Sequence, residues 1–326
     1  MRAAQLLAPS LLATVTVSAP EPEALAEGEV IVRVSAASIC GSDIPHFLRG
    51  DPPTEHPGGG AGYPLHEIMG QVSASRSADL EVGRQVVGWA SRMDGLAEFV
   101  VTDASQLAIC ELCLPPWEAV VAQPLACVLF AVSRLGNVAD KNVAVIGLGP
   151  IGLLFCHVLS NAGARSVTGI DIVDRSEVAS EYGVTQFVHG SSSDWVRNLN
   201  ESRRPEILIE AVGHQPATLR DAIGATAKGG TIYCFGIPAL AEYPVDLSTV
   251  VGNNLTVIGG RTLDRRRSLE QACRYMTTHP KLASAMVTHV LPIDDAQRAY
   301  DVASRPAPGR LKVVLVPTHD PLTVSA

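Results

Sequence analysis

Val143-Ala-Val-Ile-Gly147-Leu-Gly149-Pro-Ile-Gly152 is the stretch of this chain that decides its fold. A run of apolar residues leads into a G-x-G-x-x-G turn, and a helical pattern follows to residue 161. In such a turn Gly147 allows the sharp bend, Gly149 lets the backbone approach a pyrophosphate, and Gly152 lets the helix pack closely on the strand. The order of strand, turn and helix therefore predicts a dinucleotide-binding βαβ unit.

An acidic residue at the end of the next predicted strand indicates which dinucleotide is bound. Asp171 lies 19 residues beyond Gly152, the spacing of the carboxylate that binds the ribose hydroxyls. A carboxylate there would repel a 2′-phosphate, so NAD is favoured over NADP, although Arg175 leaves some tolerance for NADP. Pro150 and Ile151 begin the helix whose N-terminal N–H groups would bind the pyrophosphate. We count all of these residues as predicted cofactor contacts.

Strands and helices alternate after the double proline at residues 115–116. Besides 143–147 and 166–171, strand patterns occur at 206–210, 230–235 and 255–259. This alternation predicts an α/β fold with a doubly wound parallel sheet of six strands. Gly213, Gly236 and Ile237 follow two of these strands, where they would lie on the nicotinamide side.

The chain before this region has a different pattern. Residues 1–108 contain short β-rich runs such as 29–34 and 85–89, and a loop rich in proline and glycine covers 51–62. The end of the chain shows a helix at 266–278, a strand at 287–291, a helix at 294–304 and a strand at 311–316. We predict a catalytic domain at 1–123, a nucleotide-binding domain at 124–260 and a return to the first domain at 261–326.

The composition excludes several classes of protein. With 47% hydrophobic and 18% charged residues the chain is globular, and its net charge of −8 would repel nucleic acid. The apolar stretch 143–159 contains the glycine turn, so we expect no membrane span. Seven scattered cysteines and no cleavable apolar segment at the start predict a reducing, cytoplasmic location. The basic group Arg261, Arg265, Arg266 and Arg267 is interpreted as a solvated face rather than a phosphate site.

Possible metal ligands lie upstream of the nucleotide domain. Cys40-Gly41-Ser42-Asp43 precedes the proline- and glycine-rich loop, and His66-Glu67 follows it. Thiolate, imidazole and carboxylate are the three side-chain types that bind zinc. Each is unremarkable alone, because a single cysteine or histidine is more often structural. Together with the dinucleotide motif they predict a metal site.

These motifs, in this order, resemble the zinc-dependent alcohol and polyol dehydrogenases of the medium-chain dehydrogenase/reductase family, with sorbitol, threonine and galactitol-phosphate dehydrogenases nearest. The resemblance spans nearly the whole chain. It implies a β-rich, GroES-like catalytic domain beside a Rossmann domain, NAD, one catalytic zinc and a small alcohol or ketone substrate, of a polyol or cyclitol kind. Cys40 and His66 match the zinc ligands of the family, Glu67 binds the metal or lies beside it, and Gln123 aligns with a further ligand.

Two positions depart from the family pattern. The polyol branch has Glu-Pro-Leu where this chain has Gln123-Pro-Leu, so zinc should bind less tightly. With Cys40 and Glu67 as the only anions the metal centre would be near neutral and its Lewis acidity higher. Leu65 replaces a glycine before His66. Cys127, one helical turn after Gln123, is a lesser candidate for a substitute ligand.

The structural zinc lobe of the family would fall between residues 89 and 98, where this chain has no cysteine. Cys110-x-x-Cys113 lies too late and has no second cysteine pair, so we expect no structural zinc.

The resemblance also implies a route for the proton. Ser42 matches the hydroxyl that relays the proton, and His46 is the candidate terminal acceptor, since its imidazole titrates near neutrality. His46 stands six residues after Cys40, where the family's histidine is usually five after. Asp43 is expected to hold the loop or a ligand imidazole.

Two other functions stay open at this point. Gln123 and Leu65 are the best evidence for a zinc-free reductase of the quinone or enoyl type, against which stand Cys40, His66 and Glu67. A non-catalytic NAD sensor would need a broken ligand set or relay. Family members pair through the last strand of the nucleotide domain, so 255–259 is the expected edge of a homodimer or homotetramer.

Overall fold

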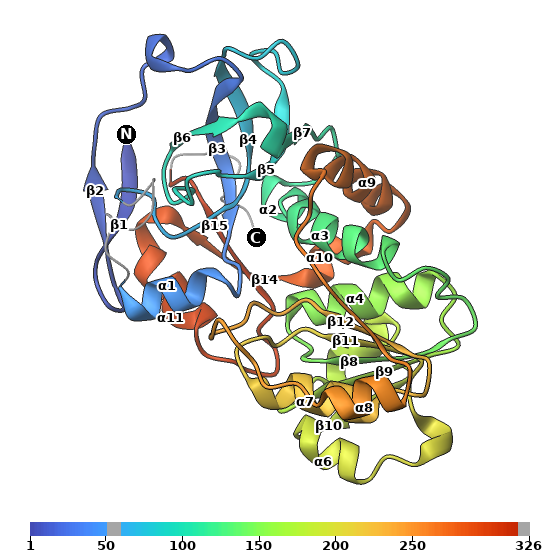
Figure 1. The fold of residues 1–326 in the computed structure, drawn as a ribbon. Helices are drawn as coiled ribbons and strands as arrows, with labels where there is room; N and C mark the ends of the chain where they lie inside the picture. The colour runs from blue at the N-terminus through green and yellow to red at the C-terminus, as the bar shows by residue number, and fades with distance from the viewer. Residues whose placement is uncertain (51–59, 319–326) are drawn as a thin grey trace. The chain divides into compact units, whose positions relative to one another are not determined.

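The computed structural model describes residues 1–50 and 60–318, which divide into two compact units (Figure 1). The first unit contains Met1–Ala126, Asp264–Pro306 and the chain from Arg310 onward. The second contains Cys127–Leu263 and Ala307–Gly309. The sequence predicted the boundaries between the two units at 123/124 and 260/261. Most of the loop expected at 51–62 lies outside the described residues.

The first unit is rich in strands. They are β1 (Arg2–Ala8), β2 (Leu11–Thr16), β3 (Glu29–Ser38), β4 (Glu67–Ser75), β5 (Gln85–Trp89), β6 (Phe99–Asp103), β7 (Leu107–Ile109), β14 (Val287–Pro292) and β15 (Lys312–Val316). β1 and β2 form a hairpin, and the others form one sheet in the order β14-β15-β3-β4-β5-β7, with β6 also paired to β3. The last described strand, β15, thus pairs with β3 within the first unit, to which the order of elements predicted that the chain returns.

Short helices complete this unit. They are α1 (Asp43–Arg49), α2 (Pro116–Ala119), α9 (Arg265–Thr278), α10 (Lys281–Met286) and α11 (Ala296–Ala303), with 3-10 turns at Pro22–Ala24, Ala104–Gln106 and Ile293–Asp295. α3 (Ala122–Ser133) carries the chain into the second unit. Alternate residues of β3, β4 and β6 point into one core, which Phe47 of α1 and Tyr300 of α11 close.

The second unit is a doubly wound domain. Its strands are β8 (Asn142–Ile146), β9 (Ser166–Asp171), β10 (Gln186–His189), β11 (Ile207–Glu210), β12 (Thr231–Cys234) and β13 (Thr256–Gly259). They are all parallel, in the order β10-β9-β8-β11-β12-β13. Its helices are α4 (Pro150–Asn161), α5 (Ser176–Ala179), α6 (Ser192–Arg197), α7 (Pro216–Ala225) and α8 (Leu247–Gly252), with 3-10 turns at Ser180–Tyr182 and Glu201–Arg203.

Helices cover both faces of this sheet, with α4 on one face and α7 and α8 on the other (Figure 1). The strand order is that of the dinucleotide-binding fold, so the predicted α/β class is confirmed. The sequence indicated ranges for five of the strands. No range was predicted for the sixth, β10, because it is a short edge strand with exposed polar ends and no long apolar run.

One stretch, Pro116–Ser133 across α2 and α3, is long and apolar enough to cross a membrane by length and composition. More than half of it is buried inside the protein, which is equally the pattern of a core helix. The apolar stretch 143–159 of the sequence consists of β8, the glycine turn and most of α4.

Candidate active site

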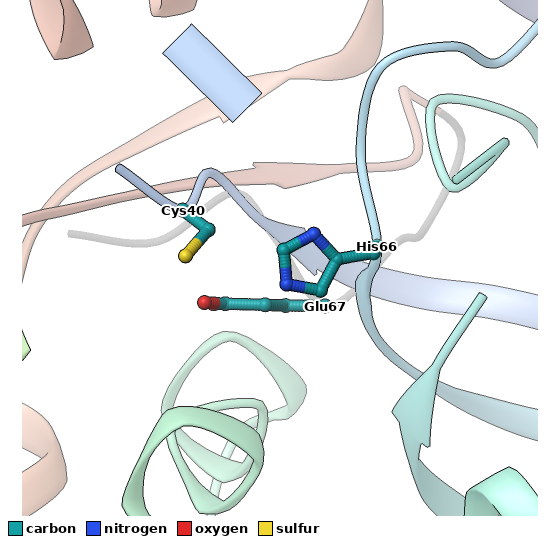
Figure 2. A group of neighbouring side chains, drawn as sticks. All are labelled: Cys40, His66 and Glu67. Atoms are coloured by element: carbon teal, nitrogen blue, oxygen red, sulfur yellow. The ribbon is translucent and has the colours of Figure 1, made fainter. Parts of the chain in front are cut away.

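The predicted metal ligands meet at the ends of two neighbouring strands. Ser38, at the end of β3, lies opposite Glu67 at the start of β4, so the chain segments that carry Cys40 and His66 emerge side by side. One donor atom from each of Cys40, His66 and Glu67 lies within 4.8 Å of the other two. Figure 2 shows the thiol beside the carboxylate, with the imidazole facing them.

Asp43 fixes two members of this cluster. One carboxylate oxygen lies 2.8 Å from Nδ1 of His66, and the other accepts a hydrogen bond from the backbone N–H of Cys40 at 2.9 Å. Asp43 is completely buried. The predicted role of Asp43 is therefore confirmed, since it holds both the loop and the imidazole. A histidine that is bonded through Nδ1 to a carboxylate presents its other nitrogen to a metal.

The same contacts set the protonation of His66. Burial lowers its pKa, but the charge and hydrogen bond of Asp43, together with Cys40, outweigh burial and raise the pKa well above 6.5. A cation bound at the nitrogen that does not contact Asp43 would have to displace any proton held there.

Lys312 is a part of this cluster that the sequence did not indicate. Its Nζ lies 2.5 Å from Oε2 of Glu67 and 3.1 Å from the carbonyl oxygen of Ile39. Both members of the ion pair are almost fully buried. Burial lowers the pKa of Lys312, but Glu67, Cys40 and Asp43 outweigh it and raise that pKa above 10.5. Lys312 adds one positive charge and Asp43 one negative, so the expected near-neutral centre is unchanged.

Gln123 lies against Glu67 from the start of α3. In the one orientation of its amide that gives both neighbours a partner, its Nε2 donates to Oε1 of Glu67 at 3.3 Å and its Oε1 accepts from the indole N–H of Trp89 at 2.7 Å. Trp89 is the last residue of β5 and the direct cross-strand neighbour of Glu67. Gln123 is therefore beside the ligand cluster, as expected, but its ligation of a metal stays a prediction.

The donor set fits a zinc ion. A thiolate, an imidazole and a carboxylate from three side chains match catalytic zinc sites, which keep a further position for substrate. Leu65 does not displace His66, because its side chain is buried in the core of the first unit and packs beside Gly95. Among the described residues, Cys40, His66 and Glu67 are the one such group of three metal-binding side chains.

Three cysteines considered from the sequence lie outside this group. They are Cys110, Cys113 and Cys127. Cys110 is buried, whereas Cys113 is exposed.

The relay candidates lie on α1. Ser42 directly precedes this helix without a side-chain capping hydrogen bond, and His46 follows one turn later, so the two side chains share a face. Nδ1 of His46 lies 2.7 Å from the hydroxyl of Tyr63, a buried residue that the sequence did not indicate. Both relay candidates are partly exposed.

The glycine turn of the second unit has the predicted geometry. Gly147 has a positive φ of 92°, which disfavours a side chain. A Cβ on Gly152 would lie 1.8 Å from the carbonyl oxygen of Gly147, so only glycine lets α4 pack this closely on β8. Gly149 faces open space. The two backbone predictions are confirmed, and phosphate binding at Gly149, Pro150 and Ile151 stays a prediction.

Asp171 and Arg175 have different hydrogen-bond partners. Asp171 ends β9, and its two oxygens accept hydrogen bonds from the backbone N–H groups of Leu148 at 2.5 Å and Val173 at 2.8 Å. It thus lies directly beside the glycine turn. Arg175 is only 3% exposed and donates to the carbonyl oxygens of Ala307 and Pro308. Its burial lowers its pKa. These bonds favour a structural role for Arg175 over the predicted cofactor contact.

Two further turns follow β11 and β12. The backbones of Gly213 and Gly236 touch, since a Cβ on Gly213 would lie 2.1 Å from the carbonyl carbon of Gly236. Buried Glu210 holds this turn by accepting hydrogen bonds from the N–H of Gly213 at 2.9 Å and the hydroxyl of Thr218 at 2.8 Å. Ile237 is half exposed. The predicted nicotinamide-side residues therefore lie together at the carboxyl ends of adjacent strands.

Two arginines of the basic group, Arg265 and Arg266, make side-chain contacts within the first unit. Arg265 stacks on Trp89, with its guanidinium carbon 4.9 Å from the ring centroid, and donates to Gln106. Arg266 pairs with Asp79 at 2.7 Å. These contacts agree with the interpretation that the group is not a phosphate site.

Both halves of the chain match models of known families. Residues 26–114 match the model described as "Alcohol dehydrogenase GroES-like domain", and residues 150–278 match "Zinc-binding dehydrogenase". Together the two models cover most of the described chain.

Relatives with known names match the chain over nearly its whole length. A D-altritol 5-dehydrogenase of Agrobacterium fabrum is 29% identical over 83% of this chain and 87% of its own. An L-threonine 3-dehydrogenase of Caldanaerobacter subterraneus is 25% identical over 89% and 91%. The structure of an alcohol dehydrogenase from Thermus sp. ATN1 superposes with a TM-score of 0.83 at 25% identity, covering 97% of this chain and 99% of that chain. Both models describe alcohol or zinc-binding dehydrogenases, and all three proteins are named as dehydrogenases. We conclude that this chain belongs to the zinc-type medium-chain dehydrogenase family.

Proposed function

We propose that the protein uses NAD and one zinc ion to oxidise a secondary alcohol of a polyol or cyclitol to the ketone. The observation that carries the proposal is the cluster of Cys40, His66 and Glu67, whose donor atoms lie within 4.8 Å of one another. The substrate class is supported by the relative named for D-altritol. A zinc ion at this cluster would act as a Lewis acid that lowers the pKa of an alcohol hydroxyl toward neutrality.

The residues of the first unit would hold the reacting group and remove its proton. Asp43 keeps the imidazole of His66 turned toward the cluster, and Lys312 balances the charge of Glu67. Ser42 and His46, one helical turn apart, would pass the proton of the hydroxyl outward to solvent. A hydride would leave the carbon that bears this hydroxyl, and NAD would accept it.

The residues of the second unit would bind the dinucleotide. The N–H groups at the start of α4 would bind the pyrophosphate, and the open space at Gly149 would let the backbone approach it. Asp171, beside the turn, would accept hydrogen bonds from the ribose hydroxyls. The hydrogen bonds of Arg175 to the carbonyl oxygens of Ala307 and Pro308 would restrain its guanidinium from turning to a 2′-phosphate.

Reduction of NAD and of NADP should be followed with the purified protein against a panel of polyols and cyclitols, with L-threonine as a comparison. We expect turnover with NAD, and kcat/KM with NADP lower by about tenfold or more because Asp171 meets the 2′-phosphate. A chelator should stop the reaction and added zinc should restore it. Reduction of activated double bonds by NADPH, insensitive to the chelator, would instead support the zinc-free reductase.

We also propose that two copies pair through the edge strand β13. Within the described residues β13 pairs with β12 on one side only, Val257 of this strand is 44% exposed, and large apolar side chains are exposed in α8 before it and in the chain after it. Val251 is 74% exposed and Leu263 85% exposed. A pairing of two β13 strands would cover these side chains in a symmetric dimer, on which a tetramer could be built.

All seven cysteines are free thiols, which supports a reducing, cytoplasmic location.

Val251→Glu combined with Leu263→Glu should convert the oligomer to a monomer, because two charges would be placed in each apolar contact. The mass in solution, measured by light scattering after size exclusion, checks this. Val82→Glu is the control, since Val82 is 62% exposed but lies in the first unit. An unchanged mass for the double variant would show that another surface forms the oligomer.

A further inference from the structure

Both carboxylate oxygens of Glu67 are held by hydrogen-bond donors. Lys312 donates to Oε2 and the amide nitrogen of Gln123 donates to Oε1. Glu67 has no exposed surface, so water does not compete for these positions. The direction of this carboxylate within the ligand cluster is therefore set by two partners, one from β15 and one from α3.

The orientation of the Gln123 amide follows from the chemistry of its two neighbours. The indole N–H of Trp89 can only donate, and the carboxylate of Glu67, paired with Lys312, can only accept. The amide oxygen must then face Trp89 and the amide nitrogen must face Glu67. Gln123 is 1% exposed, which leaves little room for another arrangement.

Trp89 is itself fixed in place. It lies directly opposite Glu67 in the β4–β5 pairing, and the guanidinium of Arg265 covers its ring. Arg265 is in turn bonded to Gln106. A continuous set of contacts thus runs from α9 through Trp89 and Gln123 to Glu67.

We propose that Gln123 is a positioning residue for Glu67 and not a metal ligand, with Trp89 as the group that orients its amide. The inference rests on the proposed zinc site. An amide can ligate zinc only through its oxygen, and here that oxygen accepts the hydrogen bond of Trp89. The nitrogen, which cannot ligate, faces the cluster.

In the metal-free protein the same geometry favours an amide over the carboxylate that the polyol branch has at position 123. A glutamate would accept the Trp89 hydrogen bond equally well, but its second oxygen would face Oε1 of Glu67 at the 3.3 Å now spanned by a donor. Two acceptors of like charge would then meet in a buried site. An amide supplies an acceptor on one side and a donor on the other.

The first test replaces the metal by Co²⁺, whose visible spectrum reports the number and kind of its ligands, in wild type and in Gln123→Ala. We expect the same absorption bands in both proteins, with kcat lowered about 10-fold to 100-fold, the range for groups that orient ligands. A changed spectrum that shows the loss of one ligand would overturn the proposal.

Trp89→Phe keeps an aromatic ring beneath Arg265 but removes the N–H, so it tests the arrangement even if Gln123→Ala does not fold. It should lower kcat as Gln123→Ala does. The kcat of the double variant should be no lower than that of either single variant. Trp195→Phe is the matched control, because Trp195 lies in the core of the second unit and should leave kcat unchanged. Additive effects of the two changes would contradict a shared role.

Gln123→Glu separates this proposal from that of zinc catalysis. In protein stripped of metal by a chelator, we expect a lower melting temperature for Gln123→Glu than for wild type, because two carboxylates meet without a cation between them. An equal or higher melting temperature would overturn the proposed contact. A wild type that takes up no metal would refute the zinc mechanism, while this melting comparison would still decide the hydrogen-bond arrangement.

Discussion

Replacing Cys40 by alanine is expected to remove the metal and lower kcat/KM by about 1,000-fold or more. The metal contributes several kcal/mol of transition-state stabilisation in such sites, and each 1.4 kcal/mol is a factor of ten. Cys40 supplies the one thiolate of the cluster, and its backbone N–H is bonded to Asp43, which should keep the loop folded without the sulfur. Elemental analysis and NAD reduction on the same preparations would measure both effects.

Cys113→Ala provides the control for this experiment. Cys113 is an exposed free thiol outside the ligand cluster, so its loss should change neither metal content nor kcat/KM. If Cys40→Ala kept its metal and its activity, the cluster would not be the catalytic centre.

Lys312→Met is expected to destabilise the metal-free protein by about 3–5 kcal/mol, because it leaves the carboxylate of Glu67 buried without its cation. Glu67 is fully buried, and its ion pair with Lys312 spans 2.5 Å. Equilibrium unfolding in urea, in the presence of a chelator, would give the free energy of unfolding. The methionine retains most of the volume of the lysine stem, so the loss reports the charge.

Two further variants define the origin of this effect. Glu67→Gln added to Lys312→Met should recover part of the lost stability, because the unpaired charge is removed. Lys141→Met is the matched control, since Lys141 pairs with Glu206 on the surface and its loss should cost about 1 kcal/mol or less. Equal losses for Lys312→Met and Lys141→Met would show that the buried pair has no special importance.

The dinucleotide turn could be predicted from the sequence because its requirements are local. Gly147 needs a positive φ and Gly152 needs room for a carbonyl oxygen, and both demands fall within six residues of one strand and helix. The cluster of Cys40, His66 and Glu67 could be predicted from residue types and from a resemblance that spans the chain. Asp43 was recognised for the same reason, since it stands three residues after Cys40.

The partners of Glu67 could not be predicted in this way. Lys312 is 245 residues away in the sequence, and nothing local distinguishes it from any other lysine. Trp89 is recognisable as the end of a strand, but its hydrogen bond depends on where α3 places Gln123. The burial of Arg175 likewise depends on the carbonyl groups of Ala307 and Pro308, which the fold brings to it from the far end of the chain.

The zinc content of the purified wild-type chain, determined by elemental analysis together with NAD reduction on polyols, tests the central claim most directly. The account predicts about one zinc per chain, lost with activity on chelation and regained with activity when zinc is added. A metal-free chain that turns over its substrate, or one whose activity is indifferent to chelation, would contradict the zinc mechanism assigned to Cys40, His66 and Glu67.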